Sequence, residues 1–391
     1  MTTSNHMTRR RETQALALAI PAGALSPLPV LAQGAPTAAT FPGADWDVAL
    51  GAGFRPTGLE AAEAKLVTMP TTALMVVTSG RLAYRYGDIA QVSYLASARK
   101  SILSMLYGKY VANGTINLDA TMGDLGIDED DGLLPIEKTA RVRDLLIASS
   151  GVYHAAGSPG DSPDKPERGG KQPGSYFLYN NWDFNVLGAV FEKQTGKSVF
   201  NALAEDLAQP LALQDFDPKR QRMMGYQNQS RYLAYHLFLS ARDMARLGLV
   251  MARGGRWNNK QIVPADWVKE STRQHVPASA TGRGELGYGY LWWIPATRTG
   301  PEWAGAFMAS GQFGQYILAL PAIDTVIVHR RAVTDEFAIA RNLGKTQFTP
   351  QPVTASEFLK VADVIVAAIW AMPISGGSRR TGPARNGRAP T

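Results

Sequence analysis

The chain has 391 residues, of which 45% are hydrophobic and 19% are charged, a composition that excludes a mainly disordered or fibrous protein. It has no cysteine, so disulfide bonds, thiolate metal sites and a cysteine nucleophile are excluded. The formal net charge is +7, of which residues 1–33 carry +2, residues 373–391 carry +4 and residues 34–372 carry only +1. Nucleic-acid binding would require a basic face on this central part, whose net charge is close to zero, so we expect no nucleic-acid partner.

Residues 1–33 have the organisation of a secretory signal peptide. The basic run Arg9–Arg11 precedes a short apolar run at residues 15–20, and Val30–Ala32 ends on a small residue before Gln33. This pattern predicts an exported protein, periplasmic or secreted, that is cleaved after Ala32. A disordered N-terminal extension is the alternative, because three prolines weaken the apolar run.

The start of the chain and the export route stay open. Met7 is an alternative start to Met1, and Glu12 stands where a twin-arginine signal usually carries an apolar residue. No other stretch reaches the roughly 18 apolar residues of a membrane span, so we expect no stable membrane insertion after processing. Residues 373–391 are rich in Gly, Ser, Pro and Arg, which predicts a disordered basic tail.

Strand patterns lie at both ends of the remaining chain, and helical patterns fill its middle. Strand pairs are expected within residues 72–86, around the turn pair Ser79-Gly80, and at residues 315–320 and 325–329. Helices are expected at 142–148, 181–195, 199–207, 240–253 and 264–271. A capping box at residues 354–357 opens a helix that should run to about Met372.

This order predicts an α+β fold, in which an antiparallel sheet built from the N- and C-terminal segments is flanked by helices and carries a mostly helical inserted subdomain. Residues 34–372 should form this single domain. Its sheet region covers about 65–110 and 285–372, and its helical region covers about 111–284.

Three short motifs carry candidate chemistry, and the first is Ser97-Ala-Arg-Lys100 at the start of a helical stretch that reaches Tyr110. Residues i and i+3 share a helix face, so Ser97 and Lys100 should be neighbours. Serine is a poor nucleophile until a base takes its proton. Lysine can be that base only in its neutral form, which burial or a nearby cation favours. Taken alone, a serine and a lysine three residues apart also fit an ordinary solvent-exposed helix face.

Tyr179-Asn-Asn181 follows about 80 residues later, in a loop just before a predicted helix. A tyrosine hydroxyl beside an ammonium group can relay a proton to a leaving group. Asn181 can orient the lysine and hydrogen-bond a substrate amide. The alternative is a turn followed by a helix cap.

The third motif, Ala309-Ser310-Gly311-Gln312, leads into the strand predicted at residues 315–320. Small residues at a strand edge let a substrate approach the backbone. The Gln312 N–H can then complete an oxyanion hole with the N–H of Ser97. A glycine-rich strand entry without function is the alternative.

The three motifs in this order resemble the serine hydrolases of the β-lactamase and penicillin-binding superfamily, whose Ser-x-x-Lys is a known signature. Tyr-x-Asn places the resemblance on the class C side, with its esterase and 6-aminohexanoate-dimer hydrolase relatives. Further segments over roughly residues 70–372 are similar to the same family, among them residues 143–151, 187–198, 242–257 and 287–293.

The resemblance implies a residue-by-residue assignment. Ser97 would be the acylating nucleophile, Lys100 and Tyr179 the proton-transfer pair, and Asn181 a support for the lysine or the substrate. Ser310, Gly311 and Gln312 would bind substrate, with the N–H groups of Ser97 and Gln312 as the oxyanion hole. The implied reaction is two-step acyl transfer on a small-molecule ester or amide, without metal or cofactor.

One residue departs from the class C pattern. Class C β-lactamases begin the third motif with a lysine that grips the substrate carboxylate, and Ala309 stands in that place. We therefore expect an ester or linear amide as substrate, with weak or no β-lactamase activity. A D-amino-acid peptidase is the alternative within the fold, and a catalytically silent binding or sensing module is the alternative from another class. The sequence leaves the oligomeric state open.

Other residues gave weaker indications. The five histidines lack metal-ligand spacing. His154, which follows the turn at Ser150-Gly151, is interpreted as a loop residue, with a position in the cleft as the alternative. No serine lies in the Gly-x-Ser-x-Gly pattern of α/β-hydrolases. Of the adjacent Trp292 and Trp293, one is expected to wall the acyl pocket and the other to pack in the core.

Overall fold

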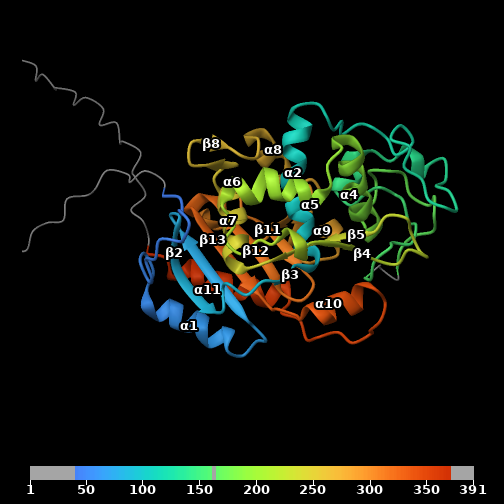
Figure 1. The fold of residues 1–391 in the computed structure, drawn as a ribbon. Coiled ribbons are helices and arrows are strands. Elements are labelled where there is room, and N and C mark those ends of the chain that lie inside the picture. The colour runs from blue at the N-terminus through green and yellow to red at the C-terminus, as the bar shows by residue number, and fades with distance from the viewer. Residues whose placement is uncertain (1–39, 161–163, 371–391) are drawn as a thin grey trace, which may run out of the picture. The chain divides into compact units, whose positions relative to one another are not determined.

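The computed structural model describes residues 40–160 and 164–370, so the predicted signal peptide and basic tail lie outside the described residues. The centre of the described chain is an antiparallel seven-stranded sheet of order β2-β1-β13-β12-β11-β10-β9 (Figure 1). Its strands are β1 (Ala73–Thr78), β2 (Arg81–Gly87), β9 (Leu286–Tyr288), β10 (Trp293–Pro295), β11 (Phe307–Gly311), β12 (Gln315–Leu320) and β13 (Thr325–Arg330).

The two ends of the domain meet inside this sheet. Strand β1 pairs with β13 from Ala73 opposite Arg330 to Thr78 opposite Thr325, although some 250 residues separate them in the chain. The predicted turn between β1 and β2 is confirmed, since Ser79 and Gly80 have φ of 52° and 76°. The fold class predicted from the sequence is therefore confirmed: the sheet is antiparallel and built from N- and C-terminal segments.

Helices cover both faces of the sheet. Helix α7 (Ala241–Ala252) lies on β12 and β13, and a side chain at Gly248 would meet Ile317 and Val326. On the other face α11 (Ala355–Ala368) packs through Phe358, whose ring stacks on Tyr316 at 4.6 Å between centroids. α1 (Pro56–Leu66) packs on α11. Alternate residues of a strand point to opposite faces, so β12 and β13 are buried along their whole length.

The helical part between the two strand groups surrounds helix α2 (Arg99–Ala112), which is buried along most of its length. Trp267 of α8 (Ala265–Ser271) donates to the Ser104 carbonyl of α2 at 2.7 Å, and Tyr107 of α2 donates to the Leu187 carbonyl of α4 (Asn181–Thr195), also at 2.7 Å. The other elements are α3 (Val142–Leu146), α4 (Asn181–Thr195), α5 (Val199–Ala202), α6 (Gln209–Leu211), α8 (Ala265–Ser271), α9 (Ala278–Thr281), α10 (Asp335–Asn342), and the strand pairs β3 (Ser93–Tyr94) with β6 (Phe238–Leu239), β4 (Arg222–Met224) with β5 (Ala234–His236), and β7 (Arg256–Trp257) with β8 (Lys260–Gln261).

Several helix ends differ from the prediction. The helix predicted to 148 ends at Leu146, because Ala148 adopts a left-handed φ of 54°. The capping box at Thr354 is present, but its helix ends at Ala368, where the chain turns extended and Ile369 bridges to Phe54. The helix predicted at 199–207 becomes α5 followed by a π-helical turn at residues 203–208.

Candidate active site

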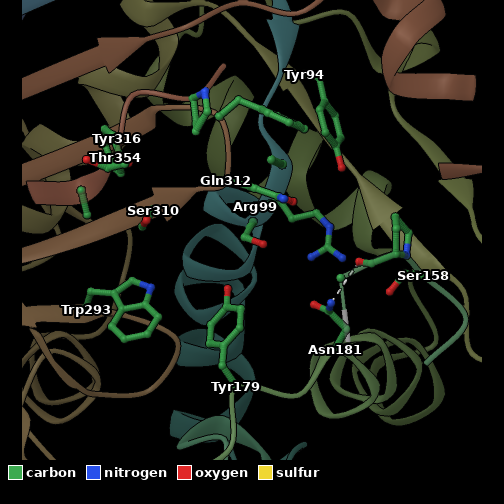
Figure 2. A pocket seen from close by; sticks show the side chains of 18 of the residues that line it. Tyr94, Arg99, Ser158, Tyr179, Asn181, Trp293, Ser310, Gln312, Tyr316 and Thr354 are labelled. Carbon is green, nitrogen blue, oxygen red and sulfur yellow. Dashed lines mark hydrogen bonds between the residues drawn. The ribbon is translucent and has the colours of Figure 1, made fainter. Parts of the chain in front are cut away.

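A cleft of about 340 Å³ opens between strand β11 and the helical region. Six of the seven residues predicted from the sequence line it, namely Ser97, Tyr179, Asn181, Ser310, Gly311 and Gln312. The seventh, Lys100, is 1% exposed and lies behind them on α2. Figure 2 shows Tyr179, Ser310 and Trp293 around one end of the cleft and Arg99, Ser158 and Asn181 around the other.

Ser97 lies in a 3₁₀ turn, η1 (Ala96–Ala98), directly before α2. The sequence predicted one continuous helix from Ser97, and the structure replaces its first turn with this tighter one. The residue before the serine, Ala96, has a φ of 48°, a conformation that costs an alanine roughly 1 kcal/mol or more. The Leu95 N–H donates to the Leu237 carbonyl at 2.9 Å. This hydrogen bond fixes the turn to the segment that contains Leu237. The turn holds Ser97 at the cleft.

Lys100 lies one turn further along and points to the second motif. Its Nζ donates to the Tyr179 hydroxyl at 2.9 Å and to Asn181 Oδ1 at 2.8 Å. The same Nζ is 4.0 Å from the centroid of the Phe184 ring and 4.2 Å from that of Tyr179. The Lys100 amine is therefore enclosed by two aromatic rings and makes two hydrogen bonds to the Tyr-x-Asn motif.

The Tyr179 hydroxyl is the second member of this group. Burial raises its pKa above the usual value, and the Ser97 hydrogen bond and the charges of Arg99 and Arg283 oppose that shift. A raised pKa keeps the phenol protonated in the free protein, so the hydroxyl has a proton to give. The ring stacks on Trp293 at 5.3 Å, which fixes its direction.

Asn181 is placed by the start of α4. Asn180 is the N-cap of that helix and accepts from the Trp182 N–H at 3.3 Å, which satisfies one of the free N–H groups of the first turn. The Asn181 side chain then accepts from Lys100 and donates through Nδ2 to the Pro159 carbonyl at 3.2 Å. Both the cap and the support for the lysine are therefore present at this motif.

The third motif lies at the end of β11, beside the turn of Ser97. At Gly311 a Cβ would lie 2.6 Å from the Leu95 carbonyl oxygen and 2.5 Å from Gln315 Oε1. Only glycine lets β11 approach the turn this closely. The Gln312 side chain is held by Arg341, another residue of the cleft lining, which donates to its Oε1 at 2.7 Å. Gln312 and Ser97 both line the cleft.

Sequence reasoning missed the charged walls of the cleft. Three arginines line it, Arg99, Arg283 and Arg341, together with His236. No Asp or Glu side chain is among the lining residues in the part of the chain that the structure describes. Burial lowers the pKa of His236 well below its usual value, so the imidazole is neutral. The position of Arg99 inside Ser-x-x-Lys was the one signal in the sequence that could have pointed to this wall.

The structure also answers the expectations for the tryptophan pair and for His154. Trp293 lines the cleft and Trp292 is 1% exposed in the core, so the division of the tryptophan pair is confirmed. His154 does not line the cleft: its Nε2 bonds Asp131 at 2.8 Å and its Nδ1 bonds the Ala155 carbonyl. Within residues 40–160 and 164–370 no group of three or more His, Asp or Glu side chains is arranged to hold a metal ion.

The fold and site together define a β-lactamase/transpeptidase-like protein, with a serine turn between an antiparallel sheet and a helical region. A family model described as Beta-lactamase matches residues 59–330. The chain belongs to this family, within the serine β-lactamase and penicillin-binding superfamily, as the resemblance predicted. No curated protein sequence matches the chain.

Solved structures show the same fold. A Bacillus anthracis protein assigned as a 6-aminohexanoate-dimer hydrolase has a TM-score of 0.57 at 19% identity, over 78% of this chain and 81% of that one. EstCE1, a hydrolase with promiscuous acyltransferase activity, has a TM-score of 0.54 at 14% identity, over 79% and 98%. An octameric penicillin-binding protein homologue from Pyrococcus abyssi has a TM-score of 0.53 at 18% identity, over 74% and 77%.

Proposed function

We propose that this protein is a serine hydrolase that cleaves an ester or a linear amide through an acyl-enzyme on Ser97. The observation that carries the proposal is the placement of Lys100 Nζ at 2.9 Å from the Tyr179 hydroxyl and 2.8 Å from Asn181 Oδ1. Ser97 lines the same cleft as Tyr179 and lowers the pKa of its hydroxyl. These positions support a proposal in which Ser97 is the nucleophile and the Lys100–Tyr179 pair accepts and returns its proton.

The reaction takes place in two halves. Ser97 Oγ attacks the substrate carbonyl carbon while its proton passes to the Lys100–Tyr179 pair, and the bond to the leaving group breaks as that group takes a proton from the pair. The N–H groups of Ser97 and Gln312 stabilise the negative oxygen that develops. In the second half a water molecule gives its proton to the pair and its oxygen to the acyl carbon, which releases the acid and restores the Ser97 hydroxyl.

The third motif favours esters and linear amides over β-lactams. Ala309 is fully buried on β11 and carries no charge, so the strand lacks the ammonium group that class C β-lactamases present there. Efficient cephalosporin hydrolysis that Ala309→Lys leaves unchanged would contradict this preference. Export to the periplasm or outside the cell remains part of the proposal, from the pattern of residues 1–33. No helix in the described residues is both long and apolar enough to cross a membrane.

Labelling with a fluorophosphonate probe tests the nucleophile. The wild type should label, Ser97→Ala should lose the label, and Tyr179→Phe should label at least about 100-fold more slowly, as expected for loss of a proton-transfer group. Ser101→Ala is the matched control, because this serine lies on the same helix and donates to the Leu291 carbonyl at 2.6 Å, outside the cleft lining. Undiminished labelling of Ser97→Ala would show that the nucleophile is another residue.

A further inference from the structure

Arg99 is a buried positive charge with few partners. Its side chain is 3% exposed, and its Nη2 makes one long hydrogen bond of 3.4 Å, to Asn185 Oδ1. In the part of the chain that the structure describes, its Nε and Nη1 have no hydrogen-bond partner, and the guanidinium lies 4.7 Å from the Tyr235 ring centroid. No carboxylate among the described residues forms an ion pair with it. A buried charge with so few partners is unfavourable unless something else compensates it.

The surroundings of Arg99 point to an anion as that partner. The guanidinium lines the cleft of Ser97, and Figure 2 shows it between Tyr94 and Asn181, with Ser158 beside it. Arg283 and Arg341 add two further cations to the same walls, and the imidazole of His236 is neutral. No Asp or Glu is among the described residues that line this cleft; Asp164 lines the adjoining pocket, on the Arg283 side. Such a cleft attracts negatively charged ligands and repels cations.

We propose that Arg99 binds a carboxylate of the substrate, so that this hydrolase prefers esters or amides that carry a negative charge near the scissile bond. The proposal rests on the proposed function, since it places the anion beside the serine that is acylated. A guanidinium offers paired N–H donors in one plane, which match the two oxygens of a carboxylate. The carboxylate would lie on the Arg99 side of the cleft, and not on strand β11, where Ala309 supplies no cation.

Two pairs of chromogenic esters test the proposal, one for each side of the scissile bond. Mono-4-nitrophenyl adipate and 4-nitrophenyl hexanoate share an acyl length and differ in a terminal carboxylate. 4-Acetoxybenzoate and 4-acetoxybenzamide carry the charge difference on the leaving group. In at least one pair the wild type should show a kcat/KM about 10- to 100-fold higher for the anion, as expected for hydrogen bonds to a charged group.

The variant Arg99→Gln removes the charge, and the ratio of kcat/KM within the preferred pair should fall to within about threefold of unity. Because both esters are measured on one preparation, the ratio does not depend on the folded fraction. Arg99→Lys keeps the positive charge but lacks the planar pair of N–H donors of a guanidinium, so it should give an intermediate ratio. Arg246→Gln is the matched control, since Arg246 is also buried but donates to the carbonyls of Leu211, Gly43 and Ala44 away from the cleft; its ratio should equal that of the wild type.

The outcomes separate the two proposals. If the wild type shows no preference for the anion in either pair, or if Arg99→Gln keeps the wild-type ratio, Arg99 does not bind a substrate carboxylate, while the serine mechanism stands. An equal loss in Arg246→Gln also overturns the inference, because the effect is then general to buried arginines. If Ser97→Ala turns over the esters like the wild type, the proposed function fails, and the inference fails with it.

Discussion

Replacing Asn181 by aspartate tests whether Lys100 must be neutral to act as the base. The two side chains have nearly the same shape, so Asn181→Asp puts a negative charge 2.8 Å from the lysine Nζ with little change in packing. An opposite charge this close favours the charged form of a group by about one to three pKa units. The amide has no such effect, because it accepts the hydrogen bond without a net charge.

The expected magnitude follows from this shift. The acidic limb of the pH profile of kcat/KM should move up by about one to three units, so that at a fixed pH on that limb the rate falls about 10- to 1000-fold. The rate should recover as the pH is raised. A 4-nitrophenyl ester assay between about pH 6 and pH 10 measures the limb directly.

The control for this experiment is Asn201→Asp, which makes the same charge change on the exposed surface of α5. Its pH profile should match that of the wild type. If Asn181→Asp keeps the wild-type rate with an unmoved limb, the neutral form of Lys100 is not required and the assignment of the base is wrong. If the rate falls equally at every pH, Asn181 acts on the substrate and not on the lysine.

Three further predictions concern stability. The pKa of His329 is lowered from 6.5 to about 4 by burial, so the unfolded chain binds a proton that the folded chain does not, and stability is lost as the pH falls from about 6.5 to 4. Between about pH 7 and pH 4.5 the wild type should lose about 2 kcal/mol more than His329→Gln in urea unfolding; the neighbouring Val328→Ala, which removes no titrating group, should keep the wild-type slope, and a parallel slope for His329→Gln would contradict the reasoning. Thr354→Ala removes the cap of α11 and should cost about 1 kcal/mol in urea unfolding; an unchanged midpoint would show that the cap does not stabilise the folded state. Gly248→Ala places a Cβ 2.6 Å from Val326 Cγ1 and should cost about 1–3 kcal/mol through overpacking, visible as a lower melting temperature; a stability gain would mean that α7 can move off the sheet.

Local patterns predicted much of the framework. The turn at Ser79-Gly80, the capping box at Thr354 and the start of α4 at Asn181 depend on hydrogen bonds and backbone angles within a few residues, and a sequence contains that information directly. The i to i+3 spacing also predicted that Ser97 and Lys100 are neighbours, although Ser97 lies in a 3₁₀ turn. Helix ends were less well predicted, because the bridge between Phe54 and Ile369 that ends α11 joins distant parts of the chain.

The sequence by itself thus predicted the fold class and the family, both of which are confirmed, and it proposed Ser97 as the nucleophile with Lys100 and Tyr179 as the proton-transfer pair. The tertiary structure decided the hydrogen bonds that join Lys100 to residues about 80 positions away, and the gathering of Arg99, Arg283 and Arg341 around one cleft without an opposing acid in the described lining. The formal charge of residues 34–372 is only +1, yet these three arginines lie together. Net charge is a sum over the chain, whereas the field in a cleft depends on which side chains the fold brings together, and that is set by packing between segments far apart in sequence.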